Sequence, residues 1–242
     1  AKEALQTLIE QTNSLLETSA TVTTSEKEQA TKLALQTTND QADAHLYCNA
    51  PHSDKNSTDY SPASEGYWLL DGDNTTFLHT NWDNNINSAD GLDQYIRVYS
   101  AEALDKFTFT YTTRWNKNGE PWVGNRTVIE VEGCNTPTGT YEPIATLSDK
   151  GTNPLPTQYY KPYAQVYTSD LLTASAPYKY IRFRVTATEQ NKTAYGHKWF
   201  YISEFAFSKV EIVKVYEAVL HGSHGATEAI AIDTYKADEE AT

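Results

Sequence analysis

The stretch Phe107-Thr-Phe-Thr-Tyr111 decides the fold class of this chain. Its large apolar residues alternate with threonine, which is typical of a β-strand with one face in a core and the other toward water. The same alternation returns at residues 129–131 and 181–185, with Arg, Glu or Thr at the polar positions. Turn-forming sequences separate the runs, at residues 116–121, 135–139 and 151–156. Several short strands with such spacing predict an antiparallel β-sandwich or barrel.

The composition narrows the possible functions. The chain has 242 residues, of which 39% are hydrophobic, and this length suffices for one substantial core. Its net charge of −13 repels phosphate groups, so we expect neither nucleic acid nor an anionic membrane as a partner. No run approaches the ~20 apolar residues of a membrane span. With 17 Tyr and 5 Trp against 7 Phe, the chain is rich in rings that suit recognition surfaces as well as cores.

The sequence before the β-rich region has a helical pattern. Leucines recur at helical spacing from Leu5 to Leu16, and a Ser/Thr-rich run at residues 18–25 is expected to end that helix. Ser25 and Glu28 then have the form of a capping box, which predicts a second helix. Two such helices would form an α-hairpin.

The sequence after the β-rich region also changes character. A glycine-rich joint at residues 222–225 is followed by a helix-like sequence from Thr227 onward, and we expect this helix to pack on the N-terminal hairpin. The predicted organisation is therefore a helical hairpin, a β-sandwich, and a linker with a C-terminal helix, at residues 1–47, 48–215 and 216–242.

Two features bear on the origin of the chain. Cys48 and Cys134 either form a disulfide or remain separate thiols, and the sequence leaves both possibilities open. The chain starts at Ala1, contains no Met and has no signal sequence. We therefore expect it to be a piece of a larger protein.

The loop sequence Asp71-Gly-Asp-Asn-Thr-Thr-Phe-Leu-His-Thr-Asn-Trp82 resembles the first characteristic loop of discoidin-like (F5/8 type C) modules. The sugar-binding relatives of these modules form carbohydrate-binding module family 32. The family motif reads Asp-Gly-(Asp/Asn)-x-x-Thr-x-Trp, and this chain departs from it with Leu78 in place of the Trp. Further segments resemble strands of the family in the right order, at residues 107–114, 127–146, 180–186 and 201–207. The resemblance implies an antiparallel β-sandwich of the jelly-roll, galactose-binding-domain-like type.

The Asp-Gly-Asp sequence followed by Thr places hard oxygen atoms on a tight turn, and such atoms suit Ca²⁺. In the family, a structural calcium ion joins this loop to a glutamate that precedes the last strand. The resemblance implies side-chain ligands from Asp71, Thr76 and Glu204, with backbone carbonyls near Trp68, Asp73 and Thr76. The alternative is an Asp-Gly turn without a metal.

Sugars are bound by flat rings that stack on a pyranose and by planar polar groups that contact its hydroxyls. The resemblance implies that a histidine, an arginine with a nearby asparagine, and a late aromatic converge at one end of the sandwich. The residues that match by position are His79, Arg114, Asn118 and Trp199. Other predicted loop residues with suitable side chains are Trp82, Trp115, Trp122, Tyr159 and Tyr160.

Several of these residues have a structural alternative. His79, Trp82 and Trp199 could turn into the core, and Arg114 could pair with a surface acid. Trp115 and Trp122 flank a turn, where burial is harder, so they are the better binding candidates.

The sequence contains no motif for nucleophilic, metal-dependent or phosphate-binding catalysis. We therefore expect a non-catalytic module that binds a glycan or glycoprotein, with structural Ca²⁺, in a larger secreted or surface bacterial protein. It would also contact neighbouring domains of the parent chain. One alternative is an architectural or protein-binding spacer with no sugar site. The other is a hydrolytic domain with an unrecognised carboxylate pair, which 32 acidic residues leave open.

Overall fold

The computed structural model divides the chain into two compact units. Unit 1 comprises residues 1–29 and 211–242, and unit 2 comprises residues 30–210. The predicted domain limits after residues 47 and 215 stay a prediction. The structure describes residues 5–9, 20–37, 42–49, 67–79, 94–113, 127–148, 150–156, 164–188, 201–221 and 227–232.

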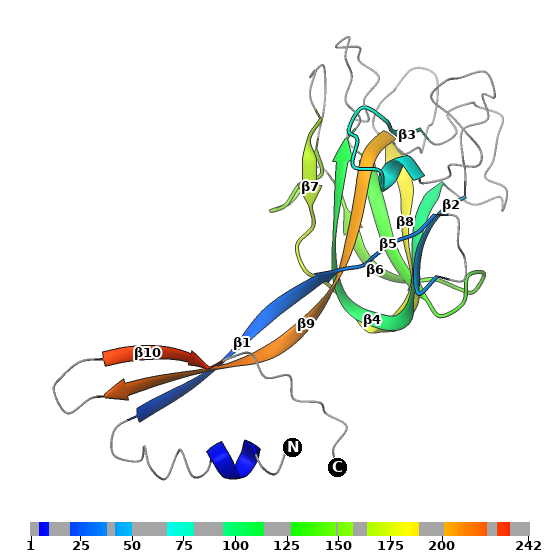
Figure 1. Ribbon diagram of the computed structural model, residues 1–242. Coiled ribbons are helices and arrows are strands. Elements are labelled where there is room, and N and C mark those ends of the chain that lie inside the picture. The colour runs from blue at the N-terminus through cyan, green and yellow to red at the C-terminus, as the bar shows by residue number, and fades with distance from the viewer. Residues whose placement is uncertain are drawn as a thin grey trace, which may run out of the picture. The chain divides into compact units, whose positions relative to one another are not determined.

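The described part of unit 2 consists mainly of antiparallel strands (Figure 1). One sheet path runs β1-β9-β4-β8-β5-β6, while β2 and β7 pair with β4, and β3 pairs with β9. Two of the strands, β1 and β9, continue into unit 1. The strands are β1 (Ala20–Lys32), β2 (Ala44–Cys48), β3 (Leu78–His79), β4 (Tyr95–Thr113), β5 (Thr127–Cys134), β6 (Glu142–Leu147), β7 (Val166–Thr168), β8 (Leu172–Thr188) and β9 (Tyr201–His221). A short 3-10 helix, η2 (Tyr67–Leu69), precedes β3.

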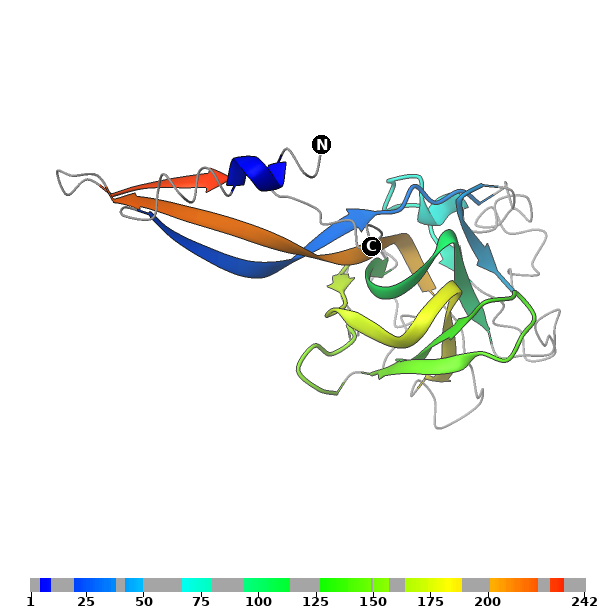
Figure 2. The same cartoon turned by 90° about the horizontal axis from the view of Figure 1, so that it is seen from below.

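The long strand β4 belongs to both layers of the sandwich. Its first part, residues 95–99, pairs with residues 180–184 of β8, and its last part, residues 107–113, pairs with β9. Register shifts between Tyr99 and Lys106 mark the place where the strand bends. Figures 1 and 2 show β4 curling at this bend. The bend closes the sheet around a core, which confirms the predicted β-sandwich.

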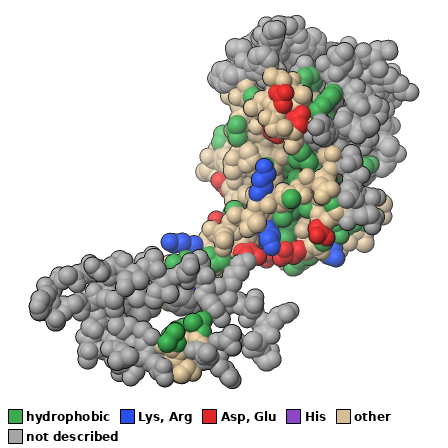
Figure 3. Space-filling view, viewed as in Figure 1, with side chains coloured by type: hydrophobic (Ala, Val, Ile, Leu, Met, Phe, Trp, Pro, Cys, Tyr) green, Lys and Arg blue, Asp and Glu red, His purple; other side chains and the backbone are tan. Residues whose placement is uncertain are grey.

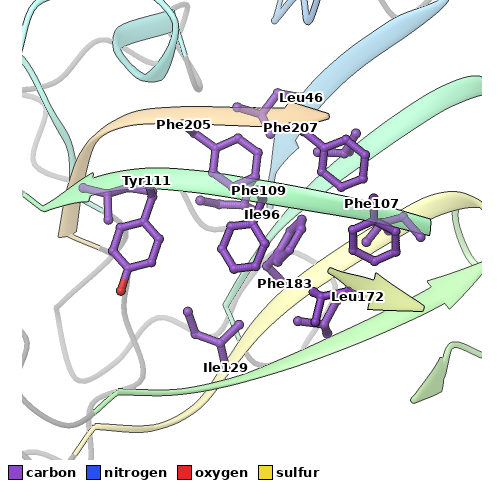
Figure 4. Close-up of a cluster of buried hydrophobic side chains, with 14 of the residues drawn as sticks. Leu46, Ile96, Phe107, Phe109, Tyr111, Ile129, Leu172, Phe183, Phe205 and Phe207 are labelled. Atoms are coloured by element: carbon purple, nitrogen blue, oxygen red, sulfur yellow. The ribbon is translucent and has the colours of Figure 1, made fainter. Parts of the chain in front are cut away.

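Aromatic side chains fill the core between the layers. Phe107 and Phe207 stack with ring centroids 5.0 Å apart, and Phe109 lies 4.6 Å from Phe183. Figure 4 shows these rings facing one another together with Phe205. The apolar positions of the three alternating runs are all buried, which confirms them as strands β4, β5 and β8.

The two cysteines do not form a disulfide. Cys48 lies on β2 and Cys134 on β5, and strands β4 and β8 lie between these two strands. Three strand spacings of about 4.8 Å put the two chains roughly 14 Å apart, well beyond the reach of a disulfide.

The described part of unit 1 consists largely of strands. In it, β10 (Thr227–Ile232) pairs antiparallel with residues 216–221 of β9, and residues 5–9 form a helical turn. No helix in the described residues is long and apolar enough to cross a membrane.

The predicted α-hairpin is wrong for the described residues after 19. Ser25 and Glu28, the expected capping box, lie within β1, where side chains 24–32 are all exposed. Leu33 and Leu35 pack against the core while the intervening Ala34 is exposed, so the true period here is two. Leu46, expected in the second helix, is buried in β2.

The predicted C-terminal helix is also wrong where the structure describes it. Residues 227–232 form β10 because pairing with β9 outweighs the helix preference of their alanines. Residues 233–242 lie outside the described part of the chain.

Candidate functional site

The acidic loop between η2 and β3 is fixed at both ends by the core. Leu69 is fully buried before the loop, and Phe77 and Leu78 are buried after it. Gly72 has a φ of +77°, a left-handed conformation that residues with a Cβ rarely adopt. The loop can therefore project polar groups from a fixed base. Figure 3 shows acidic side chains on the surface over this loop.

Hydrogen bonds within the loop orient its carboxylates. The Asp71 carboxylate accepts hydrogen bonds from the Thr76 hydroxyl at 2.7 Å and from the Asp73 N–H at 2.9 Å. The Asp73 carboxylate accepts from the hydroxyl and the N–H of Thr75, at 2.7 and 2.8 Å. These bonds from Thr75 lower the pKa of Asp73. The oxygens of Asp71, Asp73 and Thr76, all predicted calcium ligands, thus gather on one turn.

Glu204 reaches this loop from strand β9. Burial, together with a hydrogen bond with Asp71 and the charge of Asp71, raises the pKa of Glu204 to about 7. The Gly72 N–H donates to Glu204 and, with the charge of Lys32, lowers the pKa. The structure therefore brings together the two carboxyl groups, of Asp71 and Glu204, that the family resemblance implies for one site.

One oxygen of this carboxyl pair lacks a partner. Glu204 Oε1 is buried and accepts no hydrogen bond from the residues that the structure describes. A buried acceptor without a donor is costly, and a cation would satisfy it while removing the repulsion between the two carboxylates.

The donor set fits a hard cation better than a transition metal. Among the described residues, no group of three or more His, Cys, Asp or Glu side chains is arranged to hold a metal. A metal here would take two carboxylates and complete its shell with hydroxyl and carbonyl oxygens, the ligands that Ca²⁺ accepts. Trp68, whose carbonyl belongs to the predicted set, is half-buried in η2.

The predicted sugar-binding residues lie mostly beyond the described part. His79 is the last residue of β3, and its backbone pairs with Tyr201 of β9. The others lie outside the described residues: Trp82, Arg114, Trp115, Asn118, Trp122, Tyr159, Tyr160 and Trp199.

The strand ends that carry these sequences are nevertheless neighbours. His79 pairs with Tyr201, and Thr113 at the end of β4 pairs with the adjacent Ile202. The Thr113 hydroxyl accepts a 2.9 Å hydrogen bond from the N–H of Gln165, just before β7. The described strand ends at His79, Thr113 and Tyr201, and residue Gln165, therefore lie side by side.

Sequence reasoning missed a cluster of charged and aromatic residues on the outer face of the sheet. Arg97 and Tyr99, both half-buried, alternate with the buried Ile96 and Val98 of β4, and Tyr95 on the same face as Arg97 is itself buried. In an alternating strand, the polar residues between the buried ones are predicted to lie together on the opposite face of the sheet. That alternation in β4 could have indicated this cluster.

No protein-family model and no curated protein matches this sequence. Solved structures do resemble it. The family 32 carbohydrate-binding module of Clostridium perfringens NanJ, in complex with galactose, is 16% identical with a TM-score of 0.41, over 76% of this chain and 100% of that one. CpGH89CBM32-5 from the same organism, in complex with GalNAc-β-1,3-galactose, is 14% identical with a TM-score of 0.43, over 68% and 94% of the two chains.

An F5/8 type C domain from Bacteroides fragilis is 11% identical with a TM-score of 0.44, over 74% of this chain and 96% of that one. These likenesses concern the fold. The Asp71–Thr76 motif and its junction with Glu204 are features of this chain's own residues. The sequence of the loop at Asp71–Thr76 resembles that of discoidin-like modules.

Proposed function

We propose that this chain is a non-catalytic carbohydrate-binding module of a larger secreted or surface bacterial protein. The observation that carries the proposal is the adjacency of the strand ends at His79, Thr113 and Tyr201. Arg114 follows Thr113 directly in the sequence, and Trp199 precedes Tyr201 by two residues. This adjacency supports a single ligand site assembled from several loops on a rigid sheet.

Structural Ca²⁺ is the second part of the proposal. Asp71, Thr76 and Glu204, with carbonyls of Trp68 and Asp73, would hold the ion. It would supply positive charge between two carboxyl groups that otherwise share a proton. Since Glu204 lies on β9 and Asp71 on the loop before β3, the ion would fix the loop against the sheet next to the proposed sugar site.

A glycan-array screen in calcium-containing buffer tests the proposal, with galactose and GalNAc-β-1,3-galactose among the probes. Arg114→Ala, Trp115→Ala and Trp122→Ala are each expected to weaken binding at least tenfold, which corresponds to about 1.4 kcal/mol. Lys179→Ala is the matched control for loss of a positive charge, because Lys179 is exposed on β8 and lies outside the proposed site. Binding that survives all three loop substitutions would contradict the proposed site.

The alternative is an architectural or protein-binding spacer. The assignment of both flanks to a unit of their own, residues 1–29 with 211–242, favours contacts with neighbouring domains. Failure to bind any host or plant glycan on the array would favour this alternative.

A further inference from the structure

The outer face of the sheet formed by β2, β4, β8 and β5 carries a row of charged and aromatic residues. Tyr47, Arg97, Arg182 and Glu132 are direct cross-strand neighbours in that order. Two arginines therefore lie opposite each other on adjacent strands, an arrangement that is destabilising unless negative charge compensates both.

Glu132 compensates only part of this charge. Its carboxylate lies 2.7 Å from Arg182 Nη2 and 2.7 Å from Arg184 Nη2, and all three side chains are largely buried. Glu130 lies opposite Arg184 and accepts a 2.7 Å hydrogen bond from the Thr146 hydroxyl. Among the described residues, this face therefore carries three arginines, Arg97, Arg182 and Arg184, but only two glutamates, Glu130 and Glu132. Neither glutamate forms an ion pair with Arg97.

Arg97 is held by rings and by one carbonyl. Its guanidinium carbon lies 4.6 Å from the ring centroid of Tyr47 and 5.4 Å from that of Tyr180. Nη1 donates a 3.0 Å hydrogen bond to the Pro137 carbonyl, and the guanidinium also hydrogen-bonds the Tyr141 side chain. Nε is buried and has no acceptor in the described part of the chain. A guanidinium has five N–H donors, so its capacity for hydrogen bonds is not filled here.

We propose that Arg97 is the centre of a second ligand site, on the sheet face, that binds the carboxylate of an acidic sugar residue. A planar carboxylate matches the fork of a guanidinium and would supply the negative charge that Arg97 lacks. Stacking between Tyr47 and Tyr180 fixes the guanidinium in advance, which lowers the entropy cost of binding.

The surroundings favour a sugar over an acidic peptide. Tyr180 continues into an aromatic row with Tyr99 and His45, whose neighbouring ring centroids lie 5.0 and 4.7 Å apart. Rings with polar atoms suit a sugar that carries one charge among many hydroxyls. The choice of a sugar rests on the proposed function, whereas the site itself does not use the loop residues.

Isothermal titration with trigalacturonate and with its fully methyl-esterified form tests this site. The acid is expected to bind and the ester to bind at least tenfold more weakly, because only the acid can pair with Arg97. Arg97→Gln and Arg97→Lys should each weaken binding of the acid at least tenfold, since lysine keeps the charge but loses the planar fork. Lys209→Gln is the matched control, because Lys209 pairs with Glu102 elsewhere on the surface and the charge change is the same.

Amide NMR shifts of the unsubstituted protein give a readout that does not depend on the stability of a variant. Trigalacturonate should shift signals of β2, β4 and β8 around Tyr47, Arg97 and Tyr180. Equal binding of acid and ester, no binding of the acid, or shifts confined to other strands would each overturn the proposal. Equal binding of tri-aspartate would overturn the sugar assignment.

The loop variant Trp115→Ala separates this proposal from the proposed function. Trigalacturonate binding that persists in Trp115→Ala and is lost in Arg97→Gln supports the sheet-face site even if the loop site binds no glycan. Loss of trigalacturonate binding in Trp115→Ala with no loss in Arg97→Gln would assign the acidic sugar to the loop site and overturn the proposal.

Discussion

Glu204 of strand β9 shares a hydrogen bond with Asp71 of the loop before β3, and its pKa is raised to about 7. Two acidic groups this close cannot both ionise without a cost. Around neutral pH a proton and a cation therefore compete for the Glu204 carboxylate, and the first predictions concern this competition.

The stability of the ion-free protein should fall as the pH rises from about 4.5 to about 7. The pKa of Glu204 is about 7 in the folded state against 4.5 for an ordinary glutamate, so the folded state binds more protons in this window. The free energy of unfolding, measured by urea denaturation with a chelator present, should level off above pH 7. A rise in stability across this window, after correction with the Glu204→Gln variant, would contradict the raised pKa.

Calcium should reverse this dependence. The ion requires an ionised Glu204, so its binding must displace the shared proton below pH 7. We expect the apparent calcium affinity to rise by up to about tenfold per pH unit between pH 5 and 7. Calorimetry in buffers of different ionisation enthalpy should record up to one proton released per ion at pH 6. A chelator that leaves the melting temperature unchanged at pH 8 would argue against the calcium site.

Glu204→Gln should separate the two roles of this carboxyl group. Without calcium at pH 8, the variant should be more stable than the unsubstituted protein, because a partly buried negative charge beside Asp71 is gone. Its calcium affinity should fall at least about tenfold. Glu130→Gln is the control, because Glu130 accepts a hydrogen bond from Thr146 on the sheet face and plays no part in the loop.

Gly72→Ala should lower the free energy of unfolding by about 1–2 kcal/mol. The cause is the left-handed φ of +77°, because among the described residues no atom beyond the two chain neighbours of Gly72 lies within 4 Å of the position that the new Cβ would occupy. Gly133→Ala is a useful contrast, because its Cβ would collide with the ring of Tyr178. Urea denaturation should therefore show the larger loss for Gly133→Ala.

Glu132→Gln should lower the free energy of unfolding by about 3–5 kcal/mol, because it leaves Arg182 and Arg184 without their shared carboxylate in a largely buried position. Lys106→Gln, which breaks the more exposed pair with Asp105, should change it by less than about 1 kcal/mol. Equal effects of the two substitutions would contradict the burial assigned to Glu132.

The alternating runs of the sandwich could be predicted because one face of each strand is exposed to solvent and the other is buried in the core. Phe107, Phe109 and Phe183 sit where a period of two places them. The flanks could not be predicted in the same way. Ser25 and Glu28 have the local form of a helix cap, but β1, which contains them, pairs with β9. Pairing with a strand that is distant in the sequence outweighs the weak helix preference of these residues.

The candidate site likewise has a part that could be predicted from the sequence and a part that could not. The oxygen-rich turn at Asp71 was visible in the sequence because its residues are consecutive, and its link to Glu204 came from a family resemblance. The charged row through Arg97 could not be predicted, because it depends on the register of β2, β4, β8 and β5. No local pattern encodes which residue lies opposite another across four strands.

Unit 2 is one uninterrupted stretch, residues 30–210, whereas unit 1 is made from the two flanking segments of the chain. Near its two ends the backbone meets itself, because the Leu33 N–H donates a 2.9 Å hydrogen bond to the Phe207 carbonyl. A segment whose two ends lie side by side can be replaced as a whole by another segment with the same spacing between its ends. Residues 30–210 can thus diversify, or be transplanted into a loop of an unrelated carrier protein, as one continuous segment of chain.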